Sequence, residues 1–534
     1  MLLQELIALQ EEEGWLPEAG LREIAERCSV PLHRLESLST FYTHFRRSKP
    51  TGRELAVCRD VACQLAGRGN AVAALAPMLE ELGVELREVS CLGRCDTAPA
   101  GCVGERPVAL EDAAAVRAAL EASAPEPSER PVRRWAADPY SDVGERYGAL
   151  RRWAAAPEDA AAGLIDVLEQ SGLRGMGGAG FPTARKWRLV AAEPAVPKYV
   201  ICNADESEPG TFKDREVLHD LPHLVIEGMA LAGLAVGAAK GILFIRHEYA
   251  AERARFEAEL RAAYAVGALG QGLFGSGFDF EIEVFVSPGG YILGEETALL
   301  ECLEDRRGEP RNKPPFPGVV GLYGQPTVIN NVETLAHAAV IAQRGAEWWR
   351  GLAGDGFAGH KFMAVSGDVA EPGVVLVPFG TTLGELLDIC GGMKGGVPLA
   401  AIAPGGASSL FLPGDALDVA LDFDALSAAG SMLGSGAAIF VAEGRSLLEV
   451  GLDVARFFRN ESCGKCVPCR VGTEKAVKLL ESQPVTPALV EQLRELHGTL
   501  ARTSICGLGQ VALAPLLSIL DRFPAGDGDP GRAG

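Results

Sequence analysis

The sequence has no excess of basic residues. Its 50 Lys and Arg are outnumbered by 71 Asp and Glu, which gives a formal net charge of −21 at pH 7. Such a charge argues against nucleic acid or an anionic membrane surface as a partner. The sequence also has no uninterrupted run of the about 18 apolar residues that a membrane span needs. The most apolar stretch, residues 224–244, contains Glu227 and Lys240, so we expect a buried helix and a following strand there.

We also expect no secretion leader, and the sequence shows no internal repeat. Glu5 interrupts the first apolar stretch, whereas a leader has a basic segment followed by an apolar one. Metal-type cysteine spacing without such a leader predicts the reducing cytoplasm, with any membrane association made through a partner complex.

Eight of the thirteen cysteines fall into two spaced quartets. In the second quartet, Cys463, Cys466 and Cys469 stand as C-x2-C-x2-C, and Cys506 lies far downstream. Three thiolates at this pitch plus one distant thiolate suit the corners of a [4Fe–4S] cube. Zinc sites more often take two separated CxxC pairs, which leaves structural zinc as the alternative for both quartets.

The first quartet consists of two pairs, Cys58-x4-Cys63 and Cys91-x3-Cys95. Two pairs on two loops can place two sulfurs on each iron of a [2Fe–2S] rhomb. The remaining cysteines are most simply small buried apolar residues: Cys28, Cys102, Cys202, Cys302 and Cys390. Cys102 follows Cys95 closely enough that it could substitute as a ligand. A chain with two such centres moves single electrons.

The length of 534 residues predicts two to four domains, and 48% apolar with 23% charged residues is typical of a folded protein. The chain is expected to be α/β and multidomain. In order, we expect a helical segment at 1–47, a small α/β sandwich at 48–122, a Pro-rich charged linker at 123–135, a Rossmann-like α/β domain at 136–345, a small α+β module at 358–440, a helical bundle at 446–522 and a tail at 523–534.

A glycine-rich turn at 175–183 runs into a helix that Pro182 can start. Glycines let backbone N–H groups approach an anion, and a helix N-terminus adds a favourable dipole. Lys186, one turn into the helix, could complete a phosphate site. The turn is not a G-x-G-x-x-G motif, and glycine clusters often have only conformational reasons.

Two acidic segments accompany this turn. Residues 202–210 follow a predicted strand and carry Asp205, Glu206 and Glu208, and Glu295–Glu296 follows a second predicted strand at 278–286. Carboxylates suit the hydroxyls of a ribityl chain or a ribose, and they repel a 2′-phosphate, so NAD should be favoured over NADP. The alternative is a pair of solvated acidic loops.

The segment at 311–317 offers cations and the aromatic Phe316, which with Phe181 could stack on adenine or nicotinamide. Asn330 and Asn331 then precede a predicted helix, which they can cap while they contact a flavin edge or a phosphate. Turn and cap chemistry alone would also explain both segments.

These motifs, in this order, resemble those of the NADH-binding flavoprotein subunit of respiratory complex I and its soluble diaphorase relatives. The resemblance covers about 140–522, and residues 1–122 are similar to the partner [2Fe–2S] subunit, with the pair Phe41-Tyr42. Such fusions resemble the diaphorase subunits of NAD-reducing hydrogenases and NAD-dependent formate dehydrogenases. The resemblance implies a thioredoxin-like [2Fe–2S] domain, a Rossmann-like FMN and NADH domain, a ubiquitin-like (SLBB) module and a helical [4Fe–4S] bundle.

Carried over by position, the resemblance implies site residues for each cofactor. FMN would contact Gly175, Gly177, Lys186, Asn203, Asp205, Glu206, Gly294, Asn330 and Asn331, with Tyr291 near the flavin. NADH would contact Phe181, Glu208, Glu296, Lys313 and Phe316. The sequence departs from the family pattern at Met176, Ala184 and Leu293, and in a shorter gap between Cys63 and Cys91.

The predicted function is that of an NADH:acceptor oxidoreductase module. Hydride would pass between NAD(H) and FMN, and single electrons would pass through both clusters to iron–sulfur subunits of a larger complex, which could be a quinone reductase, a formate dehydrogenase or a hydrogenase. No side chain need act as acid or base in that step. The alternative is a non-catalytic electron-transfer scaffold with a decayed flavin site, which Met176 and Leu293 motivate.

Overall fold

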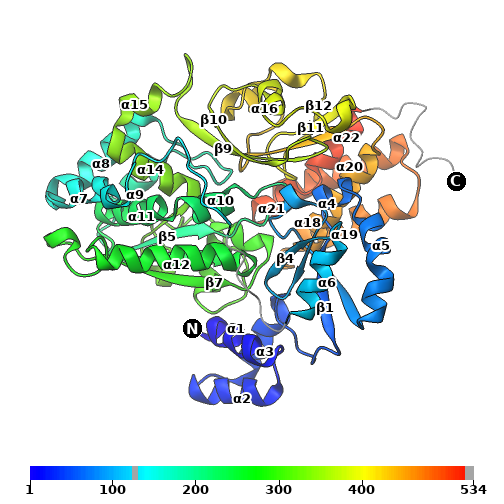
Figure 1. The fold of residues 1–534 in the computed structure, drawn as a ribbon, viewed down its shortest axis with the longest axis horizontal. Helices are drawn as coiled ribbons and strands as arrows, with labels where there is room; N and C mark the ends of the chain where they lie inside the picture. The colour runs from blue at the N-terminus through cyan, green and yellow to red at the C-terminus, as the bar shows by residue number, and fades with distance from the viewer. Residues whose placement is uncertain (123–129, 524–534) are drawn as a thin grey trace.

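The computed structural model describes residues 1–122 and 130–523. Within them, three separate sheets are surrounded by helices, so the expected α/β multidomain fold is confirmed (Figure 1). Part of the predicted linker, 123–129, and the predicted tail from 524 onward lie outside the described residues.

The chain begins with three short helices, α1 (Leu2–Glu13), α2 (Glu18–Arg27) and α3 (Leu32–Phe41). Leu3, Leu6 and Leu35 are fully buried, in a core that they share with strands of the central domain. The backbone N–H of Leu3 donates to Asp305 at 2.9 Å, and the amide of Gln4 donates to the carbonyl of Val286 at 2.9 Å. The helical start is therefore attached to the central domain.

The first sheet has the strand order β2-β1-β3-β4. Its strands are β1 (Arg53–Cys58), β2 (Val84–Val89), β3 (Ala100–Val103) and β4 (Arg106–Ala109), and its helices are α4 (Val61–Leu65), α5 (Arg68–Glu81) and α6 (Ala113–Glu121). β1 runs parallel to β2 and antiparallel to β3, and β4 runs antiparallel to β3. Leu55 and Val57 pack with apolar side chains of α5 and α6 in a small core of their own.

The central sheet is fully parallel, in the order β7-β6-β5-β8. Its strands are β5 (Tyr199–Ala204), β6 (Lys240–Arg246), β7 (Glu281–Ser287) and β8 (Thr327–Asn331). The accompanying helices are α7 (Gly148–Ala154), α8 (Pro157–Ser171), α9 (Thr183–Ala192), α10 (Lys213–Asp220), α11 (Pro222–Val236), α12 (Ala250–Ala265), α13 (Glu296–Leu303), α14 (Val332–Arg344) and α15 (Ala346–Arg350).

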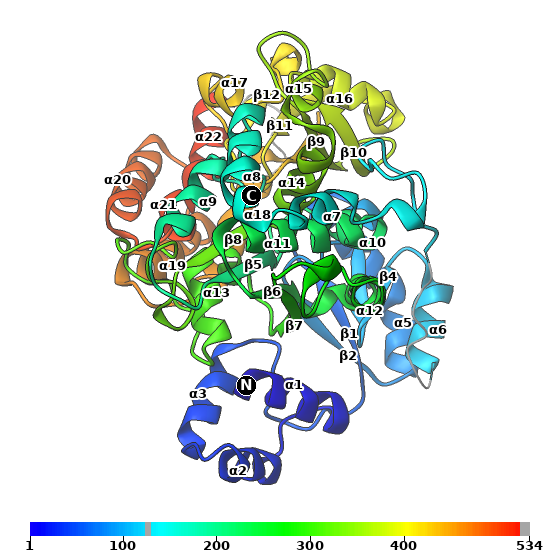
Figure 2. The same ribbon diagram turned by 90° about the vertical axis from the view of Figure 1, so that its left-hand side faces the viewer.

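Alternate residues of β5 and β6 belong to two different cores, as the two-residue period of a strand requires. Val200 and Leu243 pack with α11 and α14, whereas Ile201 and Phe244 pack with α13 and the N-terminal helices. Figure 2 shows the sheet lying between these two groups of helices. The predicted strand at 278–286 begins later than expected, because Phe280 forms only an isolated bridge with Gly270 before β7 starts.

The third sheet has the order β10-β9-β13-β11-β12. It consists of β9 (His360–Gly367), β10 (Gly373–Pro378), β11 (Leu399–Ala403), β12 (Leu412–Pro413) and β13 (Ala437–Ala442), with α16 (Leu383–Ile389) and α17 (Phe423–Ala428). β9 and β13 pair in parallel and the other neighbours pair antiparallel.

Five helices complete the described chain: α18 (Leu447–Asn460), α19 (Val467–Ser482), α20 (Pro487–Thr503), α21 (Gly507–Val511) and α22 (Ala514–Arg522). Among the described residues, no single helix has both the length and the apolar character to cross a membrane. The pair α10 and α11, bent by 93°, meets those criteria only when the two are taken together, and every residue of α11 is buried.

Candidate functional site

The second cysteine quartet is brought together at the start of two helices. Cys466 immediately precedes α19, Cys469 lies in its first turn, and Cys506 immediately precedes α21. All four cysteines share one apolar core, and the hydroxyl of Ser462 lies 3.2 Å from the sulfur of Cys469. Burial raises the pKa of Cys469 to about 11 and that of Cys506 to about 12, so a metal centre has to displace their protons. Four converging thiols fit a [4Fe–4S] cube.

The first quartet is buried beside the first sheet. Cys58 ends β1, Cys63 lies in α4, and Cys91 and Cys95 lie on the loop after β2, all four at most 4% exposed. The sulfurs of Cys91 and Cys95 are 3.5 Å apart. The backbone N–H groups of Gly93 and Ala100 each donate to a cysteine sulfur at 3.4 Å, an arrangement that suits a [2Fe–2S] cluster.

Cys102 packs beside Cys58 and Cys63, and its thiol donates to the carbonyl of Gly104 at 3.1 Å. Its role as a substitute ligand stays a prediction. Within residues 1–122 and 130–523, no three His, Cys, Asp or Glu side chains are grouped around one point as ligands of a single metal ion.

The glycine-rich turn folds back on itself before α9. The N–H of Gly175 donates to the carbonyl of Phe181 at 2.9 Å, which closes the turn. A side chain at Gly177 would begin 3.0 Å from Cβ of Asn331, so glycine permits this close approach to the end of β8 without displacing Asn331. Nζ of Lys186 donates to the carbonyl of Ile329 at 2.9 Å and lies 4.0 Å from Glu296. The turn, Lys186 and β8 therefore meet.

The acidic loop follows β5 at the same edge of the sheet, where parallel α/β sheets bind ligands. The amide of Asn203 donates to the carbonyl of Gly294 at 2.9 Å, which joins the two acidic segments. Asp205 accepts hydrogen bonds of 2.6 Å from Ser207 and Ser287, and burial raises its pKa to about 6. A ligand hydroxyl would have to share these oxygens.

Glu206 lies at the N-terminus of α10. Its carboxylate accepts from the N–H groups of Asp214 and Arg215, at 2.9 and 3.2 Å, and from the hydroxyl of Tyr249 at 2.9 Å. Burial and the neighbouring Asp214 raise the pKa of Glu206 to about 7. This carboxylate has a structural role, and its predicted contact with FMN stays a prediction.

Most of the predicted NADH residues, but not Glu208, are more accessible. Phe181 and Phe316 expose 39% and 58% of their surface, so a planar ligand could stack on their rings. The guanidinium of Arg185 lies 5.7 Å from the ring centre of Phe181. Lys313 pairs with Glu295 at 2.9 Å and with Glu296 at 3.2 Å. An incoming nucleotide would compete for these three side chains.

Of the paired asparagines at the end of β8, Asn331 caps a helix as predicted and Asn330 does not. Asn331 accepts from the N–H of Glu333 at 3.0 Å and so caps α14, and its amide donates to Asp214 at 2.5 Å. Asn330 accepts from the indole of Trp187 at 2.8 Å.

The departures from the family pattern lie in the protein interior, because Met176, Ala184 and Leu293 are at most 4% exposed and pack in the cores.

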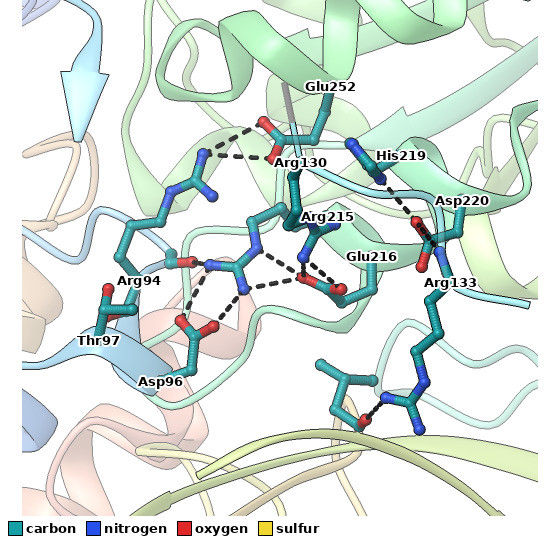
Figure 3. A network of polar contacts seen from close by, with 12 residues as sticks. Arg94, Asp96, Thr97, Arg130, Arg133, Arg215, Glu216, His219, Asp220 and Glu252 are labelled. Carbon is teal, nitrogen blue, oxygen red and sulfur yellow. Dashed lines mark hydrogen bonds and ion pairs between the residues drawn. The ribbon is translucent and has the colours of Figure 1, made fainter. Parts of the chain in front are cut away.

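Several residues that hold this region together were not foreseen. Arg215 donates to Gly93 and Asp96, on the loop that carries Cys91 and Cys95. It also pairs with Glu216, and Glu216 forms a second ion pair with Arg130 (Figure 3). The charged residues of this network follow no recognisable sequence motif. Only the folded structure brings them together.

Glu461, two residues before Cys463, was also missed. Its carboxylate accepts from the hydroxyl of Ser90, which precedes Cys91, and from the N–H of Tyr291 at 2.8 Å. A cavity of about 570 Å³ lies here and is lined by Cys91, Tyr291 and Cys463 among others. Loops that carry cysteines of both quartets therefore meet the segment of Tyr291 at one carboxylate.

Four family models match separate parts of the chain. The Nuo51 FMN-binding domain matches residues 168–340, and the thioredoxin-like [2Fe-2S] ferredoxin matches residues 1–124. The NADH-ubiquinone oxidoreductase-F iron-sulfur binding region matches residues 449–526, and the SLBB domain matches residues 362–410. The predicted cofactors are confirmed, and zinc is not retained as the alternative.

Similar proteins agree with these matches. An NADH-quinone oxidoreductase F subunit of Rhizobium meliloti is 43% identical over 388 residues, which are 72% of this chain and 92% of that protein. The HndC subunit of the NADP-reducing hydrogenase of Solidesulfovibrio fructosivorans is 41% identical over 364 residues, 67% and 74% of the two chains. In a crystal structure of NAD+-reducing [NiFe]-hydrogenase in the air-oxidized state, one chain superposes with a TM-score of 0.85 at 31% identity, over 97% of this chain and 91% of that one.

Fold and site together define an iron–sulfur flavoprotein oxidoreductase. The chain belongs to the family of NADH dehydrogenase flavoproteins that includes the NADH-quinone oxidoreductase F subunits, and it carries a [2Fe–2S] domain at its N-terminal end.

Proposed function

We propose that this chain is the diaphorase module of a larger cytoplasmic redox complex. When bound, FMN would exchange a hydride with NAD(H), and the clusters would carry electrons singly to iron–sulfur partner subunits. The observation that supports this most is the position of Glu461, whose carboxylate touches both Ser90 and Tyr291 beside Cys463. This carboxylate brings loops of both cysteine quartets next to Tyr291, which we expect to lie near the flavin.

The protein's own residues would bind and orient the flavin and the nicotinamide nucleotide. The turn at 175–183, Lys186 and the asparagines at the end of β8 would hold the flavin at the carboxyl edge of the central sheet. Glu208, Glu296 and Lys313 would hold the nicotinamide nucleotide, with Phe181 and Phe316 stacked on its rings. The acidic groups favour NAD over NADP because they repel a 2′-phosphate.

For the parent complex we propose the soluble diaphorase type. What supports it is that a chain of an NAD+-reducing hydrogenase superposes over 97% of this chain, although by sequence the R. meliloti F subunit and the HndC hydrogenase subunit match similar shares, 72% and 67%. Co-purification, with analysis of the partner for nickel, molybdenum or tungsten, would distinguish a hydrogenase from a formate dehydrogenase.

The test is an anaerobic titration of the purified protein with NADH. We expect flavin absorbance to bleach and paramagnetic signals of both reduced clusters to appear, with NADPH much less effective. Protein that holds both clusters but no flavin would leave only the non-catalytic scaffold. Flavin that NADH fails to bleach would refute the proposal.

A further inference from the structure

The SLBB domain lies directly against the acidic loop of the FMN-binding domain. On Glu208, a single oxygen accepts two hydrogen bonds from Ser408, one of 2.8 Å from its N–H and one of 2.5 Å from its hydroxyl. One residue along, the N–H of Ala407 donates to the carbonyl of Pro209 at 3.2 Å. The turn after β11 that carries Ser408 therefore follows the acidic loop for two residues.

The contact continues along the loop. The hydroxyls of Thr211 and Ser435 are 2.6 Å apart. A side chain at Gly210 would begin 2.7 Å from Ile439, and one at Gly406 would begin 2.8 Å from the carboxylate of Glu208. Such close packing leaves Glu208 little freedom to move away from Ser408.

The same domain also reaches the cap of α14. Nζ of Lys361, in β9, is fully buried and pairs with Glu333 at 2.5 Å, while it donates to the carbonyl of Ser435 at 3.0 Å. Glu333 follows Asn331 by two residues in the helix that Asn331 caps. The SLBB domain is thus fastened to both loops that we expect to hold nucleotides.

We propose that Ser408 is a positioning residue for the nicotinamide nucleotide, because it fixes the carboxylate of Glu208 through one oxygen. Both bonds from Ser408 go to Oε1, and no hydrogen bond to Oε2 occurs among the described residues. Oε2 is then left for a ribose hydroxyl. This inference rests on the proposed function, and it gives the SLBB domain a role in nucleotide binding.

The charge state of Glu208 depends on the same two bonds. Burial raises its pKa to about 7, and the hydrogen bonds from Ser408 oppose that rise. The other titratable groups that face it are the thiol of Cys91, on the cysteine loop, and the phenol of Tyr291. Neither is cationic. Replacement of Ser408 by alanine removes the hydroxyl bond and leaves the bond from the backbone N–H.

The experiment compares Ser408→Ala with the parent holoenzyme, with NADH as substrate and ferricyanide as acceptor. We expect KM for NADH to rise about tenfold, since a hydrogen bond to a charged group is lost, while kcat changes little. The acid limb of the pH profile of kcat/KM should move to higher pH, because Glu208 then ionises less readily. Ser408→Thr, which keeps both donors, should restore both values.

Ser366→Ala is the matched control, since Ser366 lies buried in β9 of the same domain and its hydroxyl has no hydrogen-bond partner. It should leave KM and the pH profile as in the parent. A parent-like KM and pH profile in Ser408→Ala with full flavin content would overturn the inference, as would an equal effect of Ser366→Ala. Failure of the proposed function itself looks different, because NADH would then not bleach the flavin of the parent protein.

Discussion

The guanidinium of Arg246 donates a hydrogen bond of 2.6 Å to the main-chain oxygen of Cys91. The same group donates to the main-chain oxygen of Glu206 and pairs with Glu248 at 2.7 Å. Arg246 is only 2% exposed and ends β6. A buried cation therefore stands between the acidic loop and the loop that carries two [2Fe–2S] cysteines.

Replacement of Arg246 should lower the midpoint potential of the [2Fe–2S] cluster. Reduction adds negative charge, which a nearby cation stabilises, and net charge is one of the determinants of cluster potentials. Arg246→Gln removes the cation and leaves Glu248 uncompensated, so both changes act in the same direction. A redox titration followed by electron paramagnetic resonance measures the effect.

Arg246→Lys keeps the charge and should retain most of the parent potential. Arg146→Gln, which breaks an ion pair of 2.6 Å with Glu259 on the far helix α12, is the control for loss of a partly buried arginine. An unchanged potential in Arg246→Gln would show that the cluster does not sense this cation.

Removal of one thiol of the second quartet should remove the cube alone. Cys506→Ser should lose the iron and sulfide of the [4Fe–4S] cluster while flavin and the [2Fe–2S] signal persist, because no cysteine of the first quartet lies in the core of the second. Iron and acid-labile sulfide analysis measures this loss. Cys390→Ser, a buried cysteine outside both quartets, should keep both clusters, and loss of a cluster in that variant would contradict the ligand assignment.

The cluster cysteines could be recognised from the sequence because thiolate chemistry restricts their spacing along the chain. The sequence also indicates a buried strand at the end of the apolar stretch 224–244, where β6 lies. Ser408, however, reaches Glu208 across 200 residues, and it has neighbours of no diagnostic type. From the sequence alone, Arg246 is simply a charged residue at the end of a predicted strand. It contacts Cys91 only because the cysteine-bearing N-terminal domain packs against the central domain.

Boundaries were harder to predict where packing overrides the pattern. Phe278 and Phe280 extend the alternation of β7 in sequence, yet the strand begins at Glu281. Phe280 is instead fully buried against Gly233 and Gly241, where a side chain would begin 2.4 and 2.9 Å from its ring. The ring fits there because Gly233 and Gly241 have no side chains. The periodicity of the sequence around Phe280 does not reveal these two distant glycines.

Gly228→Ala should destabilise the central domain by about 3 kcal/mol, the upper part of the range for overpacked cores. A Cβ at Gly228 of α11 would begin 2.1 Å from the carbonyl oxygen of Leu335 in α14, so the two helices would have to separate. Gly69→Ala in α5 meets nothing within 4 Å and should be neutral or slightly stabilising. Calorimetric melting of the two variants tests the close approach, and equal melting temperatures would contradict it.

Glu227→Gln should make the protein's stability less dependent on pH. Glu227 is fully buried, accepts from the N–H of Leu150 at 2.9 Å, and has a pKa raised by burial to about 7. The folded protein therefore keeps a proton that the unfolded chain releases near pH 4.5, and stability falls as pH rises from 5 to 8, by about 2 kcal/mol for this group. Denaturant unfolding of the glutamine variant should show a free energy of unfolding that falls by about 2 kcal/mol less between pH 5 and 8 than that of the parent. Glu158→Gln, at an exposed position, should show the same pH dependence as the parent. A variant as pH-sensitive as the parent would mean that Glu227 is already ionised in the folded protein.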